Sequence, residues 1–560
     1  MKKLLKQLLA VTTAIMMAIT LLPAMANAAD AEAQPASPTT TIDCTKKGSI
    51  TINKTTGTPE DGLDGAKFAL YRIADFTEGF KENGDLLVKT AGKTKVGDLL
   101  NLSESDQKTV ASAFAAYVEG NDEIAAVNEK TTETVNGKKG VAVFGKDDKN
   151  KSTLPVGYYL VVETDTPEGY VASTPFFVAI PQANNTSQFG TKTENETPAT
   201  GWVYDITATP KNQKVTIGKK ITSITGKDTV TNDQAATVKV GDEVGYTITS
   251  ISPKYTDEYF NYTNPDKLPV YKITDKLSSG LKYVADTLEV KIKGKNDALT
   301  TLTKNVDYKL PKNDNNDNQI TITFSQEFLK NEEYKGKEVT VTYRAEVLKS
   351  AAVTNPNTNE VELSYTNKPG SETKGVKSKD IPELYTYGLK VYKKDSNEEP
   401  LTGAKFKLYK VGKDKQKTQI TNLAGMVNGV MTAKKVEGDD GLKDTNEFIF
   451  SGLDVGDYEL EEVESPKGYT LLTDTIKFSI GDTQPDGKLD SVSGPVSIET
   501  EKKEDNTDVS TGFAKMDVTN KKGFNLPSTG GMGTYIFTIG GLVVMAGAVL
   551  LLVSSKKKRA

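Results

Sequence analysis

Two distant stretches of this chain carry the same ordered set of residues, and this repeat limits the possible folds more than any other feature. The heptapeptide GAKFALY at 65–71 recurs as GAKFKLY at 403–409. Downstream of each copy stand a tyrosine, a glutamate four residues later, a proline four residues after that, and then a Gly-Tyr pair, at 159–170 and at 458–469. Equal spacing of this kind predicts two copies of one domain, with a separate segment between them.

The segments between these landmarks alternate apolar and polar residues over short distances. Examples are ITITF at 320–324 and VTVTY at 339–343, and glycine, asparagine, aspartate and proline gather between such runs. This is the pattern of short β-strands joined by turns. It predicts a mainly all-β chain of tandem immunoglobulin-like sandwiches, with one small helical insertion in the first domain at 103–119.

A chain of 560 residues is too long for one hydrophobic core and predicts about three domains. With the repeat as a guide, we place the first domain at 46–212 and the middle domain at 213–384. The third domain, which is the second copy of the repeat, then occupies 385–522.

The composition excludes several classes of function. Histidine is absent, which excludes a Ser-His or Cys-His catalytic pair and a histidine-ligated metal site. The single cysteine, Cys44, excludes an intramolecular disulfide and a cysteine-cluster metal site. The net charge of -5, with both signs interspersed, gives no footprint for nucleic acid. We therefore expect no metal, no cofactor, no nucleic-acid partner and no enzymatic turnover.

The N-terminal stretch 1–28 has the three parts of a secretory signal peptide. A basic start is followed by an apolar run at 8–22 and by a small-x-small cleavage box that ends at Ala28. Cleavage after Ala28 would release a secreted chain. Cys44 lies too far downstream of this point to be acylated as in a lipoprotein.

The C-terminal stretch 523–560 combines three features. An LPSTG pentapeptide comes first and consists of Leu526, Pro527, Ser528, Thr529 and Gly530. An apolar run at 535–553 is long enough to span a bilayer, and a basic KKKR tail follows it at once. This combination resembles the sorting signal of sortase substrates. The resemblance implies cleavage between Thr529 and Gly530, anchoring in the cell wall, and a membrane span that exists only before sorting.

The third domain carries lysines, a glutamate and an asparagine at three landmarks of its sequence. Its first strand reads LKVYKKD at 389–395, its repeat supplies Glu462, and its last strand ends at Asn520. This set resembles the collagen-adhesin (Cna) B-type domains, which form a Lys–Asn isopeptide bond. The resemblance implies that Lys390 attacks the side-chain amide of Asn520, that Glu462 assists, and that ammonia leaves.

Such a reaction needs these residue types because the groups must be neutral in a buried site. An apolar surround disfavours the lysine ammonium and leaves a free amine as the nucleophile. The same surround keeps a carboxyl protonated, so that it can donate to the asparagine carbonyl oxygen and polarise it. Fixed contact between amine and amide can lower the barrier by ~7–11 kcal/mol. Such a bond would form once per molecule, so we do not expect the chain to be an enzyme.

The first domain lacks the two reacting partners in the same alignment. Aligning ITINK at 50–54 on LKVYK at 389–393 puts Thr51 at the position of the nucleophile. Aligning the last strands puts Ala208 at the position of Asn520. We therefore predict no isopeptide bond in the first domain, where Glu163 would hydrogen-bond to backbone or neighbouring groups instead.

The middle domain resembles the isopeptide-forming second domain of major pilins. For each role the sequence offers a preferred residue and an alternate: Lys219 or Lys220 as nucleophile, Asn359 or Asn367 as amide, and Asp275 or Asp242 as assisting acid. Lys219 is preferred because the Ile-x-Lys-x-Ile rhythm matches the family better.

The junction between the first two domains contains a further motif. The only tryptophan, Trp202, opens the segment WVYDITATPKN, which ends with Pro210, Lys211 and Asn212. This segment resembles the pilin motif, in which Lys211 would be the acceptor amine. The family usually has a β-branched residue and an aromatic before the proline, and this chain departs from that with alanine and threonine.

Taken over nearly the whole chain, the sequence resembles LPXTG-anchored major (shaft) pilins of Gram-positive bacteria. The resemblance implies that a pilus-specific sortase joins the Thr529 carboxyl to Lys211 of another copy, which gives a head-to-tail filament. A housekeeping sortase would transfer the base to peptidoglycan, and minor pilins and a host surface ligand are further expected partners. The alternative is a monomeric wall-anchored adhesin that binds a host protein or glycan, in which Lys211 is dispensable.

Overall fold

A computed structural model describes the protein. The described residues are 43–57, 61–76, 82–85, 103–119, 124–183, 202–294, 297–310, 318–438, 441–504, 506–523 and 532–557. The predicted signal peptide 1–28 and the LPSTG pentapeptide 526–530 lie outside these residues.

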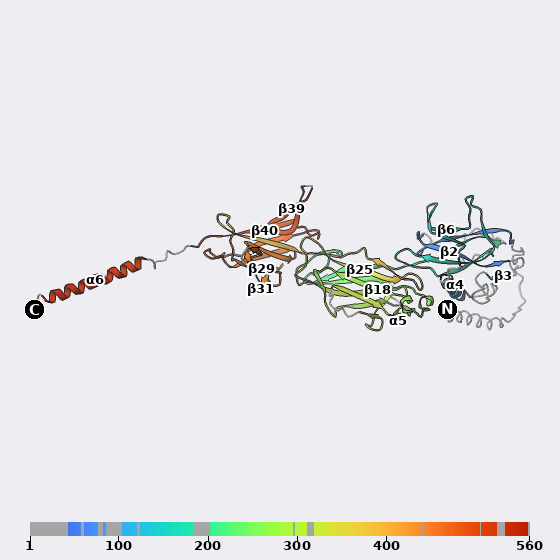
Figure 1. Ribbon diagram of the computed structural model, residues 1–560, viewed down its shortest axis with the longest axis horizontal. Coiled ribbons are helices and arrows are strands. Elements are labelled where there is room, and N and C mark those ends of the chain that lie inside the picture. The colour runs from blue at the N-terminus through green and yellow to red at the C-terminus, as the bar shows by residue number, and fades with distance from the viewer. Residues whose placement is uncertain are drawn as a thin grey trace.

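Three β-rich modules follow one another in a row (Figure 1). We call them the N-terminal module (β1 to β14), the middle module (β15 to β27) and the C-terminal module (β28 to β40). A long helix, α6 (Met532–Lys557), extends beyond the C-terminal module. The predicted fold class, tandem β-sandwiches with a helical insertion in the first, is confirmed.

The N-terminal module pairs a sheet in the order β13-β1-β6-β5, with β7 on β1, with a sheet in the order β10-β8-β2-β3, with β4 on β2. Their bounds are β1 Lys47–Asn53, β2 Lys67–Phe76, β3 Glu82–Asp85, β4 Asn128–Thr131, β5 Glu133–Val135, β6 Lys138–Phe144, β7 Leu154–Pro155, β8 Gly157–Asp165, β10 Phe176–Ile180 and β13 Asp205–Ala208. Two short pairs complete the module, β11 (Gln182–Ala183) with β12 (Trp202–Val203), and β9 (Tyr170–Val171) with β14 (Gln213–Lys214).

The helix predicted at 103–119 is observed as α4 (Glu104–Glu119). Its apolar residues at helical spacing, such as Val110, Phe114 and Val118, pack on Tyr158 and Phe177 of the second sheet. The helix therefore covers the outer face of that sheet and leaves the space between the two sheets to a separate core.

The middle module has a sheet in the order β15-β17-β24-β20-β21, with β19 on β24, and a sheet in the order β16-β27-β25-β18-β23-β22, with β26 on β25. Their bounds are β15 Ile217–Ile224, β16 Ala235–Thr237, β17 Glu243–Ile251, β18 Tyr271–Leu277, β19 Leu281–Tyr283, β20 Glu289–Lys293, β21 Leu299–Thr301, β22 Tyr308–Lys309, β23 Gln319–Phe324, β24 Glu338–Val347, β25 Asn357–Thr366, β26 Thr373–Lys377 and β27 Glu383–Tyr385. Short helices occur at η1 (Asp257–Phe260), η2 (Pro265–Lys267) and α5 (Gln326–Lys330).

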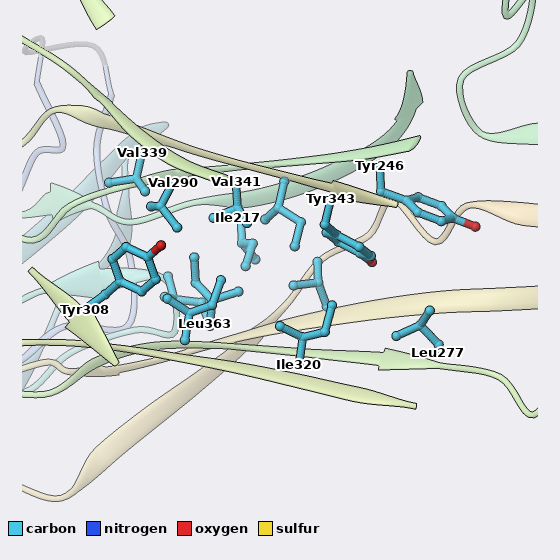
Figure 2. Close-up of a cluster of buried hydrophobic side chains, with 14 of the residues drawn as sticks. Ile217, Tyr246, Leu277, Val290, Tyr308, Ile320, Val339, Val341, Tyr343 and Leu363 are labelled. Carbon is cyan, nitrogen blue, oxygen red and sulfur yellow. The ribbon is translucent and has the colours of Figure 1, made fainter. Parts of the chain in front are cut away.

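Inward-facing residues of both sheets of the middle module form one continuous hydrophobic core (Figure 2). Apolar and polar residues alternate in the sequences of β23 and β24, and this pattern predicted strands. In the structure the apolar positions are buried and the positions between them are less buried.

The C-terminal module has a sheet in the order β35-β28-β40-β39 and a sheet in the order β31-β32-β29-β36-β37-β38, with β30 on β29. Their bounds are β28 Tyr387–Asp395, β29 Lys405–Val411, β30 Lys417–Ile420, β31 Met426–Val427, β32 Val430–Met431, β35 Glu447–Leu453, β36 Gly456–Glu464, β37 Ile476–Gly481, β38 Ser491–Ser493, β39 Ser497–Lys502 and β40 Asp508–Asn520. A separate hairpin consists of β33 (Lys435–Gly438) and β34 (Gly441–Asp444).

The two outer modules share an arrangement that the sequence repeat predicts. In each, the first strand runs parallel to the last strand beside it, β1 to β13 and β28 to β40. The glutamate of the repeat lies on a strand of the opposite sheet, β8 or β36, next to the strand that begins with the GAKF residues.

Both seams between modules are bonded through the backbone. At the first seam, Ala172 N–H of the N-terminal module donates to the Asn367 carbonyl of the middle module at 2.8 Å, and Gly169 N–H donates to the Tyr365 hydroxyl at 2.8 Å. At the second seam, Val240 of the middle module is buried in the core of the C-terminal module, and its N–H donates to the Gly452 carbonyl at 2.9 Å. Each module therefore continues into the next through ordered contacts.

Candidate functional site

The C-terminal module buries a lysine, a glutamate and an asparagine in one cluster. Lys393 on β28 donates to the Asn520 carbonyl oxygen, and its Nζ lies 3.5 Å from Glu462 Oε1. Asn520 Nδ2 donates to Glu462 Oε2 at 2.9 Å. The side chains of Lys393 and Glu462 are both fully buried. The amine and the amide that a crosslink would join are therefore already in contact.

The predicted nucleophile Lys390 does not belong to this cluster. Its side chain pairs with Glu499 at 2.7 Å and is partly exposed. Successive residues of a strand point to opposite faces, and Leu389 and Val391 of β28 are buried. Lys393 shares their inward face, whereas Lys390 faces outward. The assignment of Lys390 is therefore corrected to Lys393.

The N-terminal module contains the same three groups, contrary to the premise that its reacting partners are missing. Lys54 Nζ donates to Glu163 Oε2 at 2.8 Å, and Asn212 Nδ2 donates to Glu163 Oε1 at 2.7 Å. All three side chains are buried. Glu163 also accepts from Thr166 and Ser173, as the prediction of neighbouring hydrogen bonds required. The Asn212 carbonyl oxygen has no hydrogen-bond partner in the structure.

The alignment missed these residues because the wrong position of the first strand, Lys390 and Thr51, was taken as the nucleophile, and because the last strands were matched out of register. Lys54 lies three residues beyond Thr51, just as Lys393 lies three residues beyond Lys390. On the parallel partner, the Thr55–Lys211 bridge extends the pairing of β1 and β13 past Ala208. This extension brings Asn212 to the Glu163 carboxylate that also binds Lys54, and Asn212 lies four residues after the position that the alignment had matched to Asn520.

In the middle module the preferred residues Lys219 and Asp275 are in direct contact, and Asn359 joins them through a tyrosine. Lys219 Nζ donates to Asp275 Oδ2 and, at 2.9 Å, to the Tyr343 hydroxyl. Asn359 Nδ2 donates to the same hydroxyl at 2.7 Å. All of these residues are at most 2% exposed. Sequence reasoning did not identify Tyr343.

The alternates in the middle module lie elsewhere. Lys220 is exposed on the outer face of β15. Asp242 follows Gly241 in a turn, where its carboxylate accepts from the backbone and side chain of Lys239. Asn367 lies at the seam with the N-terminal module, and its carbonyl oxygen Oδ1 accepts from Ser371. None of these three residues has a hydrogen bond to the Lys219 cluster among the described residues.

Burial lowers the pKa of each of the three lysines and so favours the neutral amine. Desolvation lowers the pKa of Lys54 and the pKa of Lys219 to about 8 each, although the adjacent carboxylates oppose this shift. Desolvation also lowers the pKa of Lys393. In the middle module, desolvation raises the pKa of the Asp275 carboxyl, which favours its protonated form. A neutral amine beside a protonated acid is the pair that amide attack requires.

Lys211, the predicted acceptor, is exposed, and the chain on either side of it is fixed. Thr55 N–H donates to the Pro210 carbonyl at 3.1 Å, and Asn212 N–H donates to the Thr55 carbonyl at 3.0 Å. Trp202, at the start of the motif, lies on β12 and is half-buried. The lysine side chain thus projects from a backbone that is hydrogen-bonded immediately before and after it.

The C-terminal helix α6 contains the predicted membrane span 535–553. Its segment Phe537–Ser555 has a mean hydropathy of 2.3 and is long and apolar enough to cross a bilayer. Among the residues that the structure describes, no group of three acidic or cysteine side chains is arranged to hold a metal ion.

Comparison with known families gives four matches in an order that follows the modules. Residues 33–213 match the Gram-positive pilin subunit D1, N-terminal domain. Residues 240–369 match the Gram-positive pilin backbone subunit 2, Cna-B-like domain. Residues 388–494 match the SpaA prealbumin-like fold domain, and 518–559 match the LPXTG cell wall anchor motif. The chain belongs to the Gram-positive backbone pilins.

Relatives of this pilin agree with the family matches. It is similar to the fimbrial subunit type 1 of Actinomyces viscosus, with 25% identity over 459 residues that cover 75% of this chain and 76% of the relative. Its fold is similar to the T6 backbone pilin of Streptococcus pyogenes serotype M6, with a TM-score of 0.54 and 16% identity over 86% of this chain and 99% of the other. The full-length major pilin SpaD of Corynebacterium diphtheriae gives a TM-score of 0.51 and 22% identity at the same coverage.

Proposed function

We propose that this pilin is the shaft subunit of a covalent surface pilus, with Lys211 as the acceptor of each intersubunit bond. A sortase cleaves between Thr529 and Gly530 and holds the subunit as a thioester on its own cysteine. The Lys211 amine of another copy attacks this thioester, so that an amide forms to the Thr529 carboxyl and the sortase thiol leaves. Donor and acceptor differ, so the contact is head-to-tail and does not close into a ring.

The observation that carries this proposal is the setting of Lys211. Its side chain is exposed, yet both flanking peptide groups are bonded to Thr55. A bulky enzyme thioester can therefore reach the amine without any local unfolding, and the backbone that carries the lysine is held in place. An incidental surface lysine in a linker would not need a backbone held in this way. The wall anchor at the other end of the chain supplies the donor.

We also propose that each of the three buried clusters forms one isopeptide bond: Lys54 with Asn212, Lys219 with Asn359, and Lys393 with Asn520. In each, the neutral amine attacks Cγ of the asparagine, a C–N bond forms, and the bond from Cγ to Nδ2 breaks. The amine nitrogen gives up a proton, Nδ2 gains one, and ammonia leaves. The direct evidence is the contact geometry and the lysine pKa values, and the N-terminal bond replaces the earlier expectation of none.

The test of polymerisation is Lys211→Ala in the native host, with wall extracts separated by denaturing electrophoresis and probed with an antibody. We expect the ladder of high-mass species to disappear and a single wall-linked subunit to remain. Lys214→Ala is the matched control, because Lys214 is also exposed and lies three residues further along the chain. A full ladder in Lys211→Ala cells would favour the monomeric adhesin, whose wall anchor is the same.

A further inference from the structure

The assisting acids of the three clusters differ in length, and this difference affects what they touch. In the outer modules, the glutamate accepts directly from the asparagine amide, at 2.7 Å for Glu163 and 2.9 Å for Glu462. In the middle module the acid is Asp275, which is one methylene shorter. Its carboxylate accepts from Lys219 and Tyr343, while the Asn359 amide donates to Tyr343 instead.

A single oxygen atom connects the three reacting groups of the middle module. The Tyr343 hydroxyl accepts from Lys219 Nζ at 2.9 Å and from Asn359 Nδ2 at 2.7 Å, and it donates to Asp275 Oδ2 at 2.9 Å. A hydroxyl has one proton to donate and two lone pairs, so all of its hydrogen-bonding capacity is used here. In the N-terminal module, the lysine amine lies over the ring of Phe68, 5.3 Å from its centroid, and this ring has no hydroxyl.

The fold places the tyrosine between the two sheets. Tyr343 lies on β24 and stacks on its cross-strand neighbour Tyr246, at one end of the core (Figure 2). Asp275 and Asn359 lie on the neighbouring strands β18 and β25 of the opposite sheet. Leu277 is the register partner of Asn359, so Asp275, two residues before Leu277, points to the same face. The hydroxyl thus connects the aspartate to the asparagine amide, which share no direct hydrogen bond among the described residues.

We propose that Tyr343 is a catalytic residue of bond formation in the middle module, where its hydroxyl relays a proton from the Lys219 amine to the Asn359 amide nitrogen. This proposal rests on the internal bond proposed above. First, the Lys219 ammonium gives a proton to Asp275. The neutral amine then adds to Cγ of Asn359. Its nitrogen passes a second proton to the Tyr343 oxygen, and Tyr343 passes its own proton to Nδ2, which leaves as ammonia.

Two further observations agree with this sequence of proton transfers. Asp275 Oδ1 and Asn359 Oδ1 are both buried acceptors without a hydrogen-bond donor in the structure. Once Asp275 carries the first proton, it can supply a donor to a neighbouring acceptor and polarise the amide. Burial and the Asp275 charge raise the pKa of Tyr343 well above its usual value, so the hydroxyl keeps its proton until the relay step. Tyr343 ends the reaction as a neutral hydroxyl.

The test is Tyr343→Phe in the full chain, sampled at intervals after synthesis, digested, and analysed by mass spectrometry for crosslinked and uncrosslinked peptides of each Lys–Asn pair. General acid–base catalysis is worth about 10²-fold or more, and we expect the Lys219–Asn359 bond to form at least ~10²-fold more slowly. The bonds of the outer modules serve as internal controls in the same sample. Tyr271→Phe is the matched control, because it removes another buried hydroxyl from the strand that carries Asp275.

The double variant Asp275→Glu with Tyr343→Phe separates catalysis from packing. A longer acid should reach the amide as the glutamates of the outer modules do, and we expect it to restore bond formation at least tenfold over Tyr343→Phe alone. Unchanged kinetics in Tyr343→Phe, or no rescue in the double variant, would overturn the relay. An uncrosslinked middle module in the unsubstituted chain would instead refute the internal bond, which is the proposal beneath it.

Discussion

The outer modules and the middle module bring a lysine, an acid and an asparagine together by different routes. In the outer modules, the lysine and the asparagine lie on, or just beyond the ends of, parallel neighbouring strands of one sheet, and a glutamate comes from the opposite sheet. In the middle module, Lys219 lies on β15 of one sheet, whereas Asn359 and Asp275 lie on the other. A bond would therefore join neighbouring strands in the outer modules and join two sheets in the middle one.

This difference indicates that the proposed bond requires a lysine, an acid and an asparagine to meet, whichever strands of the sandwich carry them. Where the acid spans the gap alone, the cluster needs three residues. Where the acid is shorter, a tyrosine from the lysine-bearing sheet completes the contacts. The comparison can be tested by removing the nucleophile, by exchanging the acids, by titrating the amine and by loosening a seam.

The largest effect is expected from Lys393→Ala, which removes the proposed bond of the C-terminal module. Lys393 and Asn520 are 127 residues apart, and a crosslink that closes a loop of this size stabilises by about 5 kcal/mol in the chain-entropy account. After correction for the substitution itself, the intact mass should exceed that of the crosslinked chain by one ammonia, because none is released. The midpoint temperature of this module's calorimetric transition should fall. Lys390→Ala is the control and should leave both unchanged, because its partner Glu499 is outside the cluster.

A second prediction exchanges the acid of the C-terminal module. Glu462→Asp shortens the side chain in a cluster where the structure records no tyrosine hydroxyl bonded to Lys393 or Asn520. We expect the Lys393–Asn520 bond to form about 10²-fold more slowly, because the general acid no longer reaches the amide. Time-resolved peptide mapping measures the rate. Equal rates for glutamate and aspartate would show that the length of the acid is unimportant. The proposed difference between the outer modules and the middle module would then be wrong.

A third prediction concerns the pH dependence of the middle module without its bond. Asn359→Ala leaves Lys219 buried, with its pKa lowered by desolvation to about 8, against about 10.4 in the unfolded chain. The unfolded state therefore binds more protons between these values, and stability should rise with pH there, by on the order of 1 kcal/mol from pH ~8 to ~9.5. Above this range, buried tyrosines with raised pKa values oppose the trend.

Calorimetry of the middle-module transition at a series of pH values measures this slope. Adding Lys219→Met to Asn359→Ala should abolish it, because the titrating amine is then absent. A slope that persists in the double variant would assign the pH dependence to other groups.

The smallest effect is expected at the first seam. Lys368 and Glu119 pair at 3.2 Å, with side chains 28% and 32% exposed. Partly exposed ion pairs contribute little, so Lys368→Ala should change the unfolding free energy by less than ~1 kcal/mol. Chemical denaturation measures this change in unfolding free energy. High salt should remove most of the difference between the variant and the unsubstituted chain, because it screens the ion pair. A larger loss would mean that this pair, and not the backbone bond from Ala172 to Asn367, holds the seam.

Much of the fold and part of the site follow from the sequence. The repeat and the alternating strands predict the sandwiches, and the Ile-x-Lys-x-Ile rhythm correctly favours Lys219 as an inward residue. The same rhythm, applied to Ile50 and Ile52 or to Leu389 and Val391, would have identified Lys54 and Lys393. The error lay in matching strands by resemblance rather than by the face on which each side chain lies.

Two features could not be read from the sequence. Asn212 enters its cluster because the pairing of the first and last strands continues through the Thr55–Lys211 bridge, which is a matter of register. Tyr343 is one of several tyrosines in alternating strands, and only the packing of β24 opposite β18 and β25 brings its hydroxyl to Lys219. Both depend on long-range strand order, which short motifs do not specify.

The parallel pairing of β28 and β40 has a consequence for the mechanics of a fibre. Tension enters the C-terminal module at the start of β28 and leaves it after Asn520 at the end of β40. With the Lys393–Asn520 bond in place, the load passes from one strand to the other through that bond and bypasses residues 394–519 between them. If those residues unfolded under load, they would add roughly 400 Å of extended chain. With the bond in place they bear no load. Such a fibre would then lengthen very little under tension.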